Sequence, residues 1–331
     1  MCTSPVSRAF TVAVAMFALV GVHRTALAQA QPYPSKPIRV IVAHPPGTPA
    51  DLVVRVLSEK LRESGGQPLI VENRTGVSGG LGAEVVARAA PDGYTLLATI
   101  DAAVAVVKLI YPKFPVDPVK EFSMIAMLGD KGVQVLVVPA DSRAQNLKDF
   151  IEQARRSSQT IVAQAEPGTP GHLVAAVLSR LAKTDLQVVT FRGPVAAVQE
   201  VIAGRAAASF APMSTAAPFV TGGRVRALMV TGGTRSEFLP QVPTSTEAGF
   251  PEVETRFNWI GLFAPAGTPI EIQTWLNREV RRITALPEVR EQFRKLALHP
   301  GNQSLAELKD GWAADRTYWA RLVPQLGINL D

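Results

Sequence analysis

The chain has 331 residues, 47% of them hydrophobic and 19% charged, with a formal net charge of +6 at pH 7. This composition excludes an intrinsically disordered chain and is sufficient for a large core. The single cysteine, Cys2, excludes a disulfide framework, and the mild positive charge favours small anionic ligands without supporting nucleic-acid binding.

The first residues follow a pattern typical of a secretory signal peptide. Arg8 precedes an apolar run over residues 9–22, and a small-residue pattern follows at 26–28. We therefore expect residues 1–28 to be a cleaved signal peptide and the mature protein to be soluble and periplasmic. Loss of Arg8 and Arg24 with this leader lowers the net charge from +6 to about +4.

Short β-rich runs then alternate with helical patterns. The first strands are expected at 38–43, 69–71 and 94–100, with helices at 52–61 and 81–89. A stiff, proline-rich connection between Lys108 and Phe122 follows. Further strands are expected at 133–138, 161–164, 186–191, 206–210 and 225–230, and a last one at 259–264 before long amphipathic helices.

This alternation predicts an α/β protein with two units, each a mainly parallel sheet flanked by helices. The last helices are expected to return to the first unit. We predict one lobe from residues 33–131 and 254–331, and a second lobe from 132–253. A ligand cleft is expected between the lobes, at the carboxyl ends of the strands.

The turn after the first strand favours an anion site. Thr48 is placed as the N-cap of the next helix, Pro49 as its first residue, and Asp51 as a side chain that bonds back to the cap. The remaining free N–H groups and the helix dipole favour a carboxylate or phosphate oxygen. The alternative is that Thr48 and Asp51 only cap the helix.

Three further turns could face the same cleft. Residues 73–82 contain four glycines but lack a P-loop lysine and the dinucleotide spacing, so an oxyanion nest is favoured over a nucleotide site. The strand at 94–100 ends beside Asp101. In the second unit, residues 166–172 repeat the Thr-Pro helix opening, and Arg192 is the first-choice cation for an anion.

Catalytic patterns are missing from the sequence. The histidines after the leader, His44, His172 and His299, have no metal-ligand spacing, and no Gly-x-Ser-x-Gly motif occurs. We therefore expect neither an enzyme nor a cofactor. A secreted α/β hydrolase would need a nucleophile and a base that the sequence does not reveal.

Several strings occur together and in a characteristic order. They are Tyr33-Pro-Ser-Lys-Pro-Ile-Arg, Pro45-Pro46-Gly47 with Asp51 and Arg55, Val71-Glu72-Asn73-Arg74, Pro91-Asp92-Gly93-Tyr94, and Ala264-Pro265-Ala266-Gly267-Thr268-Pro269. From about Tyr33 to the C-terminus the chain resembles the periplasmic solute-binding proteins of tripartite tricarboxylate transporters, the Bug family. This resemblance implies a two-lobed periplasmic binding protein of type II whose cleft closes on a small carboxylate.

The resemblance also implies a set of ligand-binding positions, in which backbone groups and water from the first-lobe turns hold the carboxylate. Carried over by position, the set is Pro46, Gly47, Thr48, Asp51, Ser78, Gly79, Thr99 and Asp101 in the first lobe, with Thr169, His172, Arg192 and Gly193 in the second. His44 replaces the usual aromatic residue before Pro-Pro-Gly and joins the set. It either adds a charge below about pH 6.5 or replaces a ring in packing.

Asp101 departs from the small neutral residue usual at its position, and it suggests a ligand preference. A carboxylate there would repel a second carboxylate of the ligand. We therefore expect an organic acid, amino acid or aromatic acid or amide with an amino, amide or hydroxyl group, rather than citrate. The implied partners are the membrane permease subunits of the transporter or, alternatively, a sensor kinase, and the protein is expected to be a monomer.

Overall fold

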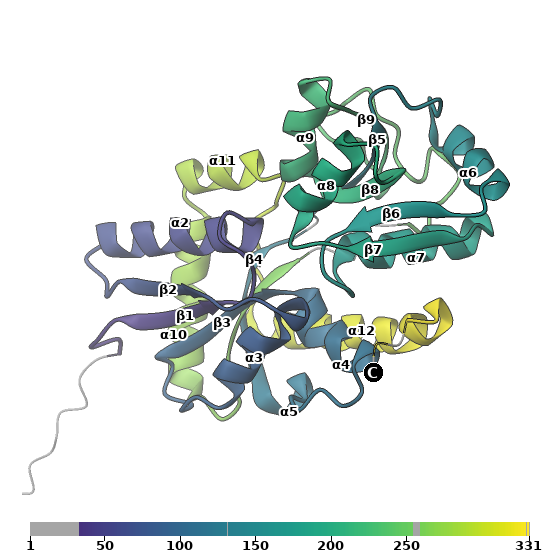
Figure 1. Cartoon of the computed structure of the whole chain (residues 1–331). Coiled ribbons are helices and arrows are strands. Elements are labelled where there is room, and N and C mark those ends of the chain that lie inside the picture. The colour runs from purple at the N-terminus through teal and green to yellow at the C-terminus, as the bar shows by residue number, and fades with distance from the viewer. Residues whose placement is uncertain (1–32, 131, 254–258, 329, 331) are drawn as a thin grey trace, which may run out of the picture. The chain divides into compact units, whose positions relative to one another are not determined.

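Two five-stranded sheets organise the chain in the computed structural model, which describes residues 33–130, 132–253, 259–328 and 330 (Figure 1). The predicted signal peptide lies outside the described residues. The first sheet has the order β2-β1-β3-β10-β4. Its strands are β1 (Ile38–Val42), β2 (Leu69–Asn73), β3 (Thr95–Ile100), β4 (Phe122–Gly129) and β10 (Ile260–Pro265).

The first sheet is mixed, with one strand reversed. β1 pairs parallel with both neighbours, so that Val40 lies between Val71 and Leu96. β10 runs antiparallel to β3 and to β4. Because β1 is buried on both faces, its sequence is continuously apolar except for Arg39, as is usual for strands covered by helices on both sides.

Two layers of helices cover the first sheet. Apolar side chains of α2 (Pro49–Glu63) and α10 (Ile270–Thr284) surround Ile38 and Val40 on one face. On the other face, Ile41 and Phe263 pack with α3 (Gly80–Ala87) and α12 (Leu305–Leu322). The shorter helices of this part of the chain are η1 (Val77–Gly79), η2 (Ala102–Val106), α4 (Val107–Ile110), α5 (Pro118–Glu121), α11 (Pro287–Lys295) and η4 (Val323–Leu326).

The second sheet repeats this plan with the order β7-β6-β8-β5-β9. Its strands are β5 (Gln134–Pro139), β6 (Thr160–Gln164), β7 (Leu186–Thr190), β8 (Ala208–Pro212) and β9 (Val225–Val230). β5 is antiparallel to β8 and β9. Helices α6 (Leu147–Arg156) and α7 (Pro170–Ala182) cover one face, and α8 (Pro194–Ile202) and α9 (Met213–Thr221) cover the other.

The two mixed sheets confirm the predicted two-lobed α/β fold, with one strand that the prediction lacked. No strand was expected between 100 and 133, yet β4 occupies Phe122–Gly129 and pairs with β10. Its sequence, FSMIAMLG, has a single β-branched residue, so propensity is weak there and pairing with β10 decides the conformation. The predicted proline-rich connection contains a short helix, α5.

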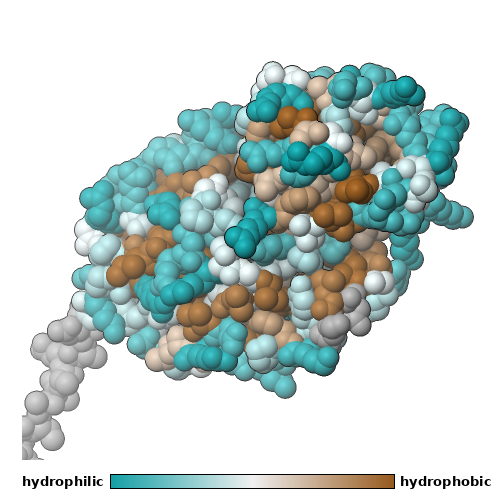
Figure 2. Space-filling view, in the orientation of Figure 1, coloured by the Kyte–Doolittle hydropathy of each residue, from teal (hydrophilic) through white to brown (hydrophobic). Residues whose placement is uncertain are grey.

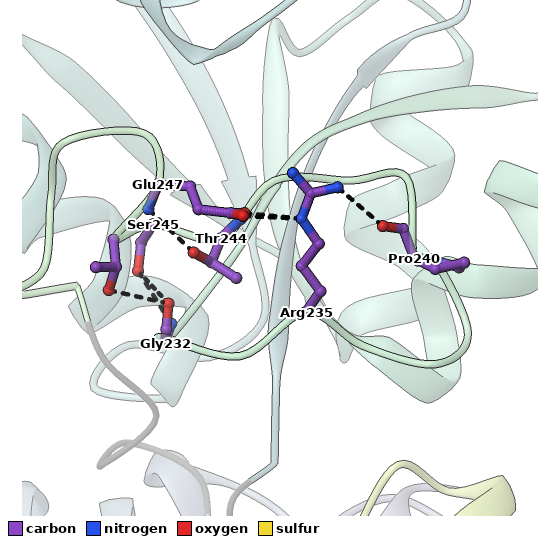
Figure 3. Close-up of polar contacts among 7 residues, drawn as sticks. Gly232, Arg235, Pro240, Thr244, Ser245 and Glu247 are labelled. Atoms are coloured by element: carbon purple, nitrogen blue, oxygen red, sulfur yellow. Dashed lines mark hydrogen bonds and ion pairs between the residues drawn. The ribbon is translucent and has the colours of Figure 1, made fainter.

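Polar contacts connect residues of the segment 231–253, which follows β9 (Figure 3). Arg235 forms an ion pair with Glu247 at 2.9 Å and donates to the carbonyl of Pro240 at 3.0 Å. The buried Ser245 hydroxyl lies 3.2 Å from the carbonyl oxygen of Gly232. Over the described residues 231–253, no helix or named strand forms, and these bonds fix the chain instead.

The end of the chain packs against the second sheet as well as the first. Trp319 in α12 and Val323 are fully buried in the same hydrophobic cluster as Leu136 of β5 and Ile110 of α4. Strands of the first sheet come from residues 38–129 and 260–265, and those of the second from 134–230. We keep 33–131 with 254–331, and 132–253, as the proposed lobe boundaries.

The surface is mostly polar, with local apolar patches. Figure 2 shows hydrophilic residues over much of one face and apolar residues gathered between them. Leu81 in α3 and Val119 in α5 are among the exposed large apolar residues. Within the described residues, no helix combines the length and apolar character that crossing a bilayer requires.

Candidate ligand-binding site

A cavity of about 90 Å³ lies where turns from both sheets meet. Three helix N-termini line it: Pro49 and Ala50 of α2, Pro170 and Gly171 of α7, and Pro194 of α8 with Gly193 before it. The remaining lining residues are His44, Pro45, Thr48, Ile100, Gln134, Gln164, Ala165, Glu166, Thr169, Phe210, Pro212 and Ile260. No lysine or arginine is among them.

The turn between β1 and α2 forms differently from the predicted cap. Thr48 is the N-cap residue, but its hydroxyl donates to the carbonyl of Pro45 at 2.7 Å instead of accepting from the helix. The carboxylate of Asp51 accepts from the backbone of Gly47 at 2.9 Å rather than from Thr48. Thr48 therefore occupies the predicted N-cap position, but the predicted side-chain cap does not form, and the first amides of α2 are left without a side-chain acceptor.

Asp51 stabilises this turn through hydrogen bonds of its buried carboxylate. The residue is 1% exposed, and its carboxylate also accepts from Arg55 at 2.9 Å and from Asn73 at 3.0 Å. Burial alone would raise the pKa of Asp51, but the hydrogen bonds from Arg55, Gly47 and Asn73 outweigh it and lower the pKa. Asp51 is not among the lining residues, so in this structure it holds the turn in place.

His44 lies in the cavity wall as a neutral ring. Its Nε2 accepts from the backbone N–H of Ile100 at 3.3 Å and lies 3.1 Å from the hydroxyl of Thr99. The proton of the neutral ring is therefore on Nδ1. Burial lowers the pKa of His44 to about 4. Of the two roles considered from the sequence, this geometry favours an uncharged wall residue over a charge that appears below pH 6.5.

The glycine-rich turn after β2 contacts the second unit rather than the cavity. Gly79 has φ of +91°, and an added Cβ would lie 3.0 Å from Ala103 Cβ and 3.1 Å from Thr99 Oγ1. The hydroxyl of Ser78 donates to the carbonyl of Pro167. Neither Ser78 nor Gly79 is a lining residue. Gly79 allows close packing within the first unit, and Ser78 connects the turn to the second unit.

Asp101 lies fully buried and outside the cavity. One oxygen accepts from the N–H of Ala102 at 2.9 Å, and the other has no hydrogen-bond partner among the described residues. Burial and the nearby negative charge of Asp315 raise the pKa of Asp101 well above its usual value, which favours the protonated form. The repulsion expected between Asp101 and a second ligand carboxylate has no support in this arrangement.

The turn between β6 and α7 copies the first one. Thr169 is the N-cap residue, and its hydroxyl donates to the carbonyl of Glu166 at 2.6 Å. His172 takes the place of Asp51: its Nδ1 accepts from the backbone of Gly168 at 2.8 Å. Burial lowers the pKa of His172 to about 4. His172 is not a lining residue, and it supports the turn as Asp51 does.

The predicted set is thus divided by the structure. His44, Thr48, Thr169 and Gly193 line the cavity. Three other predicted residues are exposed and are not lining residues: Pro46, Gly47 and Arg192. The remaining six are buried and are not lining residues either: Asp51, Ser78, Gly79, Thr99, Asp101 and His172. No group of histidine, cysteine and acidic residues suited to a metal ion occurs among the described residues.

Sequence reasoning missed several lining residues. Gln134 begins β5 and Gln164 ends β6, and both are at least 98% buried. Glu166 follows two residues later. Burial raises its pKa, and this outweighs the lowering by the backbone amide of Ser78. For Gln164 the available signal was a polar residue at the carboxyl end of an apolar strand, where ligands of parallel sheets bind. Gln134 had no such signal, because it begins β5, and only the antiparallel direction of β5 brings it to the same edge.

Comparison with known proteins gives a consistent family. Residues 53–328 match the tripartite tricarboxylate transporter family receptor. A UPF0065 protein encoded between tcbD and tcbE in a Pseudomonas species is 34% identical over 90% of this chain and 89% of its own length. BugT from Bordetella pertussis is 30% identical over 91% of this chain and 92% of its own.

Solved structures agree with this match. MatC from Rhodopseudomonas palustris with bound malate superposes with a TM-score of 0.81, at 29% identity over 88% of this chain and all of that one. Another R. palustris protein, with adipate, gives a TM-score of 0.83 at 26% identity, over 90% of this chain and 99% of that one. On the family match and the near full-length relatives, the chain belongs to the tripartite tricarboxylate transporter receptor family.

Proposed function

We propose that this protein is a periplasmic solute-binding protein that captures a small carboxylate by closure of its two lobes and delivers it to a tripartite tricarboxylate permease. The observation that carries the proposal is the convergence of α2, α7 and α8 on one cavity. None of the three helices has a side-chain hydrogen bond at its N-cap. Their first amides and dipoles are therefore available to a carboxylate.

The comparisons support the same class of ligand. The family is a receptor family, and two of its structural neighbours hold malate and adipate. Helix N-termini bind a carboxylate without a cation, which fits a cavity lined by neither lysine nor arginine. A ligand that touches turns of both lobes favours the closed arrangement through its extra contacts there, and the permease is proposed to recognise that arrangement.

Thermal unfolding of the chain without residues 1–28 tests the proposal. The panel contains dicarboxylates, citrate, amino acids, and aromatic acids and amides. A ligand at about a hundred times its dissociation constant adds about 2.7 kcal/mol to the free energy of unfolding, which raises the midpoint by several degrees. Calorimetric titration of each active compound then gives its affinity. If no carboxylate raises the midpoint or binds by calorimetry, the proposed function is wrong.

A further inference from the structure

Gln164 presents an amide to the cavity with no partner of its own. The residue is fully buried, and neither its Oε1 nor its Nε2 has a hydrogen-bond partner among the described residues. It is also one of the lining residues of the cavity. A buried amide without partners is unfavourable, and such groups in folded proteins are normally satisfied by the protein, by water or by a ligand.

The surroundings hold this amide close to the cavity wall. Gly171, the second residue of α7, has no Cβ, and an added one would collide with Gln164 Oε1 and lie 2.5 Å from the carbonyl oxygen of Phe210. Gln134 Oε1 would lie 3.5 Å from the same point. The glycine therefore makes room for the two glutamine side chains beside the N-terminus of α7.

The charges in the lining are unfavourable for a second carboxylate. Glu166 is an acidic residue, and no lysine or arginine of the lining opposes it. His44 accepts a backbone hydrogen bond through Nε2 and is a neutral ring. With one carboxylate at the N-terminus of α2, a dianion would place the other beside the N-terminus of α7. The acidic side chain of Glu166 and the two glutamine amides lie in the same partly desolvated wall, and Glu166 opposes a second negative charge there.

We propose that Gln164 selects ligands that carry a neutral carboxamide opposite their carboxylate, so that the protein prefers the monoamide of a dicarboxylic acid to the dicarboxylate itself. The inference rests on the proposed function. The ligand carboxylate lies at the N-terminus of α2, and its carboxamide donates to Oε1 and accepts from Nε2 of Gln164. A carboxylate in that position accepts from Nε2 but leaves Oε1 without a donor.

Isosteric pairs test this preference in the protein without residues 1–28. Succinate is compared with succinamate, glutarate with glutaramate, and adipate with adipamate, by calorimetric titration at pH 7.5. We expect at least one monoamide to bind ten times more tightly than its diacid, a difference of about 1.4 kcal/mol. Gln164→Met keeps the length of the side chain and removes both polar atoms, so it should lower the affinity for that monoamide at least tenfold and abolish the preference.

Gln303→Met is the matched control. Gln303 also has a side-chain oxygen without a partner among the described residues, but it lies outside the cavity lining. This variant should keep the preference, and circular dichroism should show both variants folded. If diacids bind as tightly as their monoamides, or if Gln164→Met keeps the preference, the inference is wrong while the proposed function stands. If no carboxylate binds at all, the proposed function itself fails.

Discussion

Two buried histidines act as hydrogen-bond acceptors in this protein. His44 Nε2 accepts from Ile100, and His172 Nδ1 accepts from Gly168. Protonation of either nitrogen would break its bond to the backbone and place a charge in a desolvated position. For this reason burial lowers the pKa of both rings to about 4.

The first prediction concerns the pH dependence of stability. Between about pH 6.5 and pH 4 the unfolded chain binds protons at both histidines and the folded chain does not, so stability falls as the pH falls through this range. Each ring contributes at most about 3 kcal/mol to the change. Urea unfolding at pH 8, 6 and 4.5 measures it.

Non-titrating variants separate the two rings in the same experiment. Gln at position 44 places an oxygen near the position of Nε2, and Asn at position 172 places one near the position of Nδ1. His44→Gln and His172→Asn should each remove the contribution of one ring to the pH dependence while keeping the acceptor, and the contribution of carboxyls such as Asp51 and Asp101 stays in both variants. An unchanged pH profile in both variants would show that the histidines are not buried as neutral rings.

The second prediction concerns Asp51, which satisfies three donors behind the first turn. Asp51→Ala removes the side-chain acceptor of the Gly47 N–H. It also removes one of two acceptors of the Asn73 amide, which keeps its bond to the carbonyl of His44 at 2.9 Å. The variant should cost about 2 kcal/mol in the free energy of unfolding. Arg55→Ala should cost less than about 1 kcal/mol, because the Arg55 side chain is 50% exposed. Equal losses in chemical unfolding would show that the ion pair, rather than the turn, is what Asp51 stabilises.

At the scale of elements, one helix opening occurs three times. Residues 45–49, 166–170 and 265–269 each place a glycine with positive φ before Thr-Pro. In each case the threonine hydroxyl donates to the carbonyl three residues earlier, at 2.7, 2.6 and 2.8 Å. Only the first two openings line the cavity, because β10 is antiparallel and carries the third to the opposite edge of the sheet.

This repetition provides the third prediction with its own control. Thr48→Val and Thr268→Val each remove one hydroxyl hydrogen bond and should each cost about 1 kcal/mol of stability. Thr48 lines the cavity and Thr268 does not. Thr48→Val should therefore weaken carboxylate binding about fivefold, whereas Thr268→Val should not change it. If calorimetry gives the two variants equal affinities for the carboxylate, the helix opening at Thr48 is not part of the binding site.

At the scale of the whole molecule, the turn of the second unit is fitted against the first unit. Gly168 has φ of +73°, and an added Cβ would lie 2.5 Å from Ile110 Cδ1. Ile110 is fully buried and has little room to move. The turn at Gly168 therefore packs closely against Ile110, and the hydrogen bond from Ser78 to Pro167 joins the same turn to the first unit.

The fourth prediction is that Gly168→Ala opposes lobe closure. The variant should lose about 1 kcal/mol of stability from the positive φ and bind carboxylates roughly tenfold more weakly, because the ligand must also overcome the new contact. Gly267→Ala is the control. Gly267 has a similar φ of +83°, but an added Cβ would lie 4.0 Å from its nearest neighbour, the Cβ of Pro91, and would meet no obstacle. If both variants bind ligand equally well, the contact between Gly168 and Ile110 does not limit closure.

The periodicity of the sequence predicted most of the fold. Long apolar runs and proline or glycine turns mark β1 and β6 clearly, and the helices that follow begin at Thr-Pro as expected. β4 was missed because methionine and alanine carry little strand signal. Within the site, the lining position of Thr48 and Thr169 was predictable from strand ends. Gln164 ends an apolar strand and could have been predicted in the same way, whereas Gln134 begins a strand and carries no such signal.

The sequence by itself determined the alternation of strands and helices, the turns rich in glycine and proline at strand ends, and the family, because these depend on local pattern and order along the chain. Only the tertiary structure decided which groups face the ligand. Strand direction excluded the third Thr-Pro opening, and packing buried Asp101 behind the wall while leaving the amide of Gln164 at the cavity. Such choices depend on contacts between residues far apart in sequence, which no local pattern records.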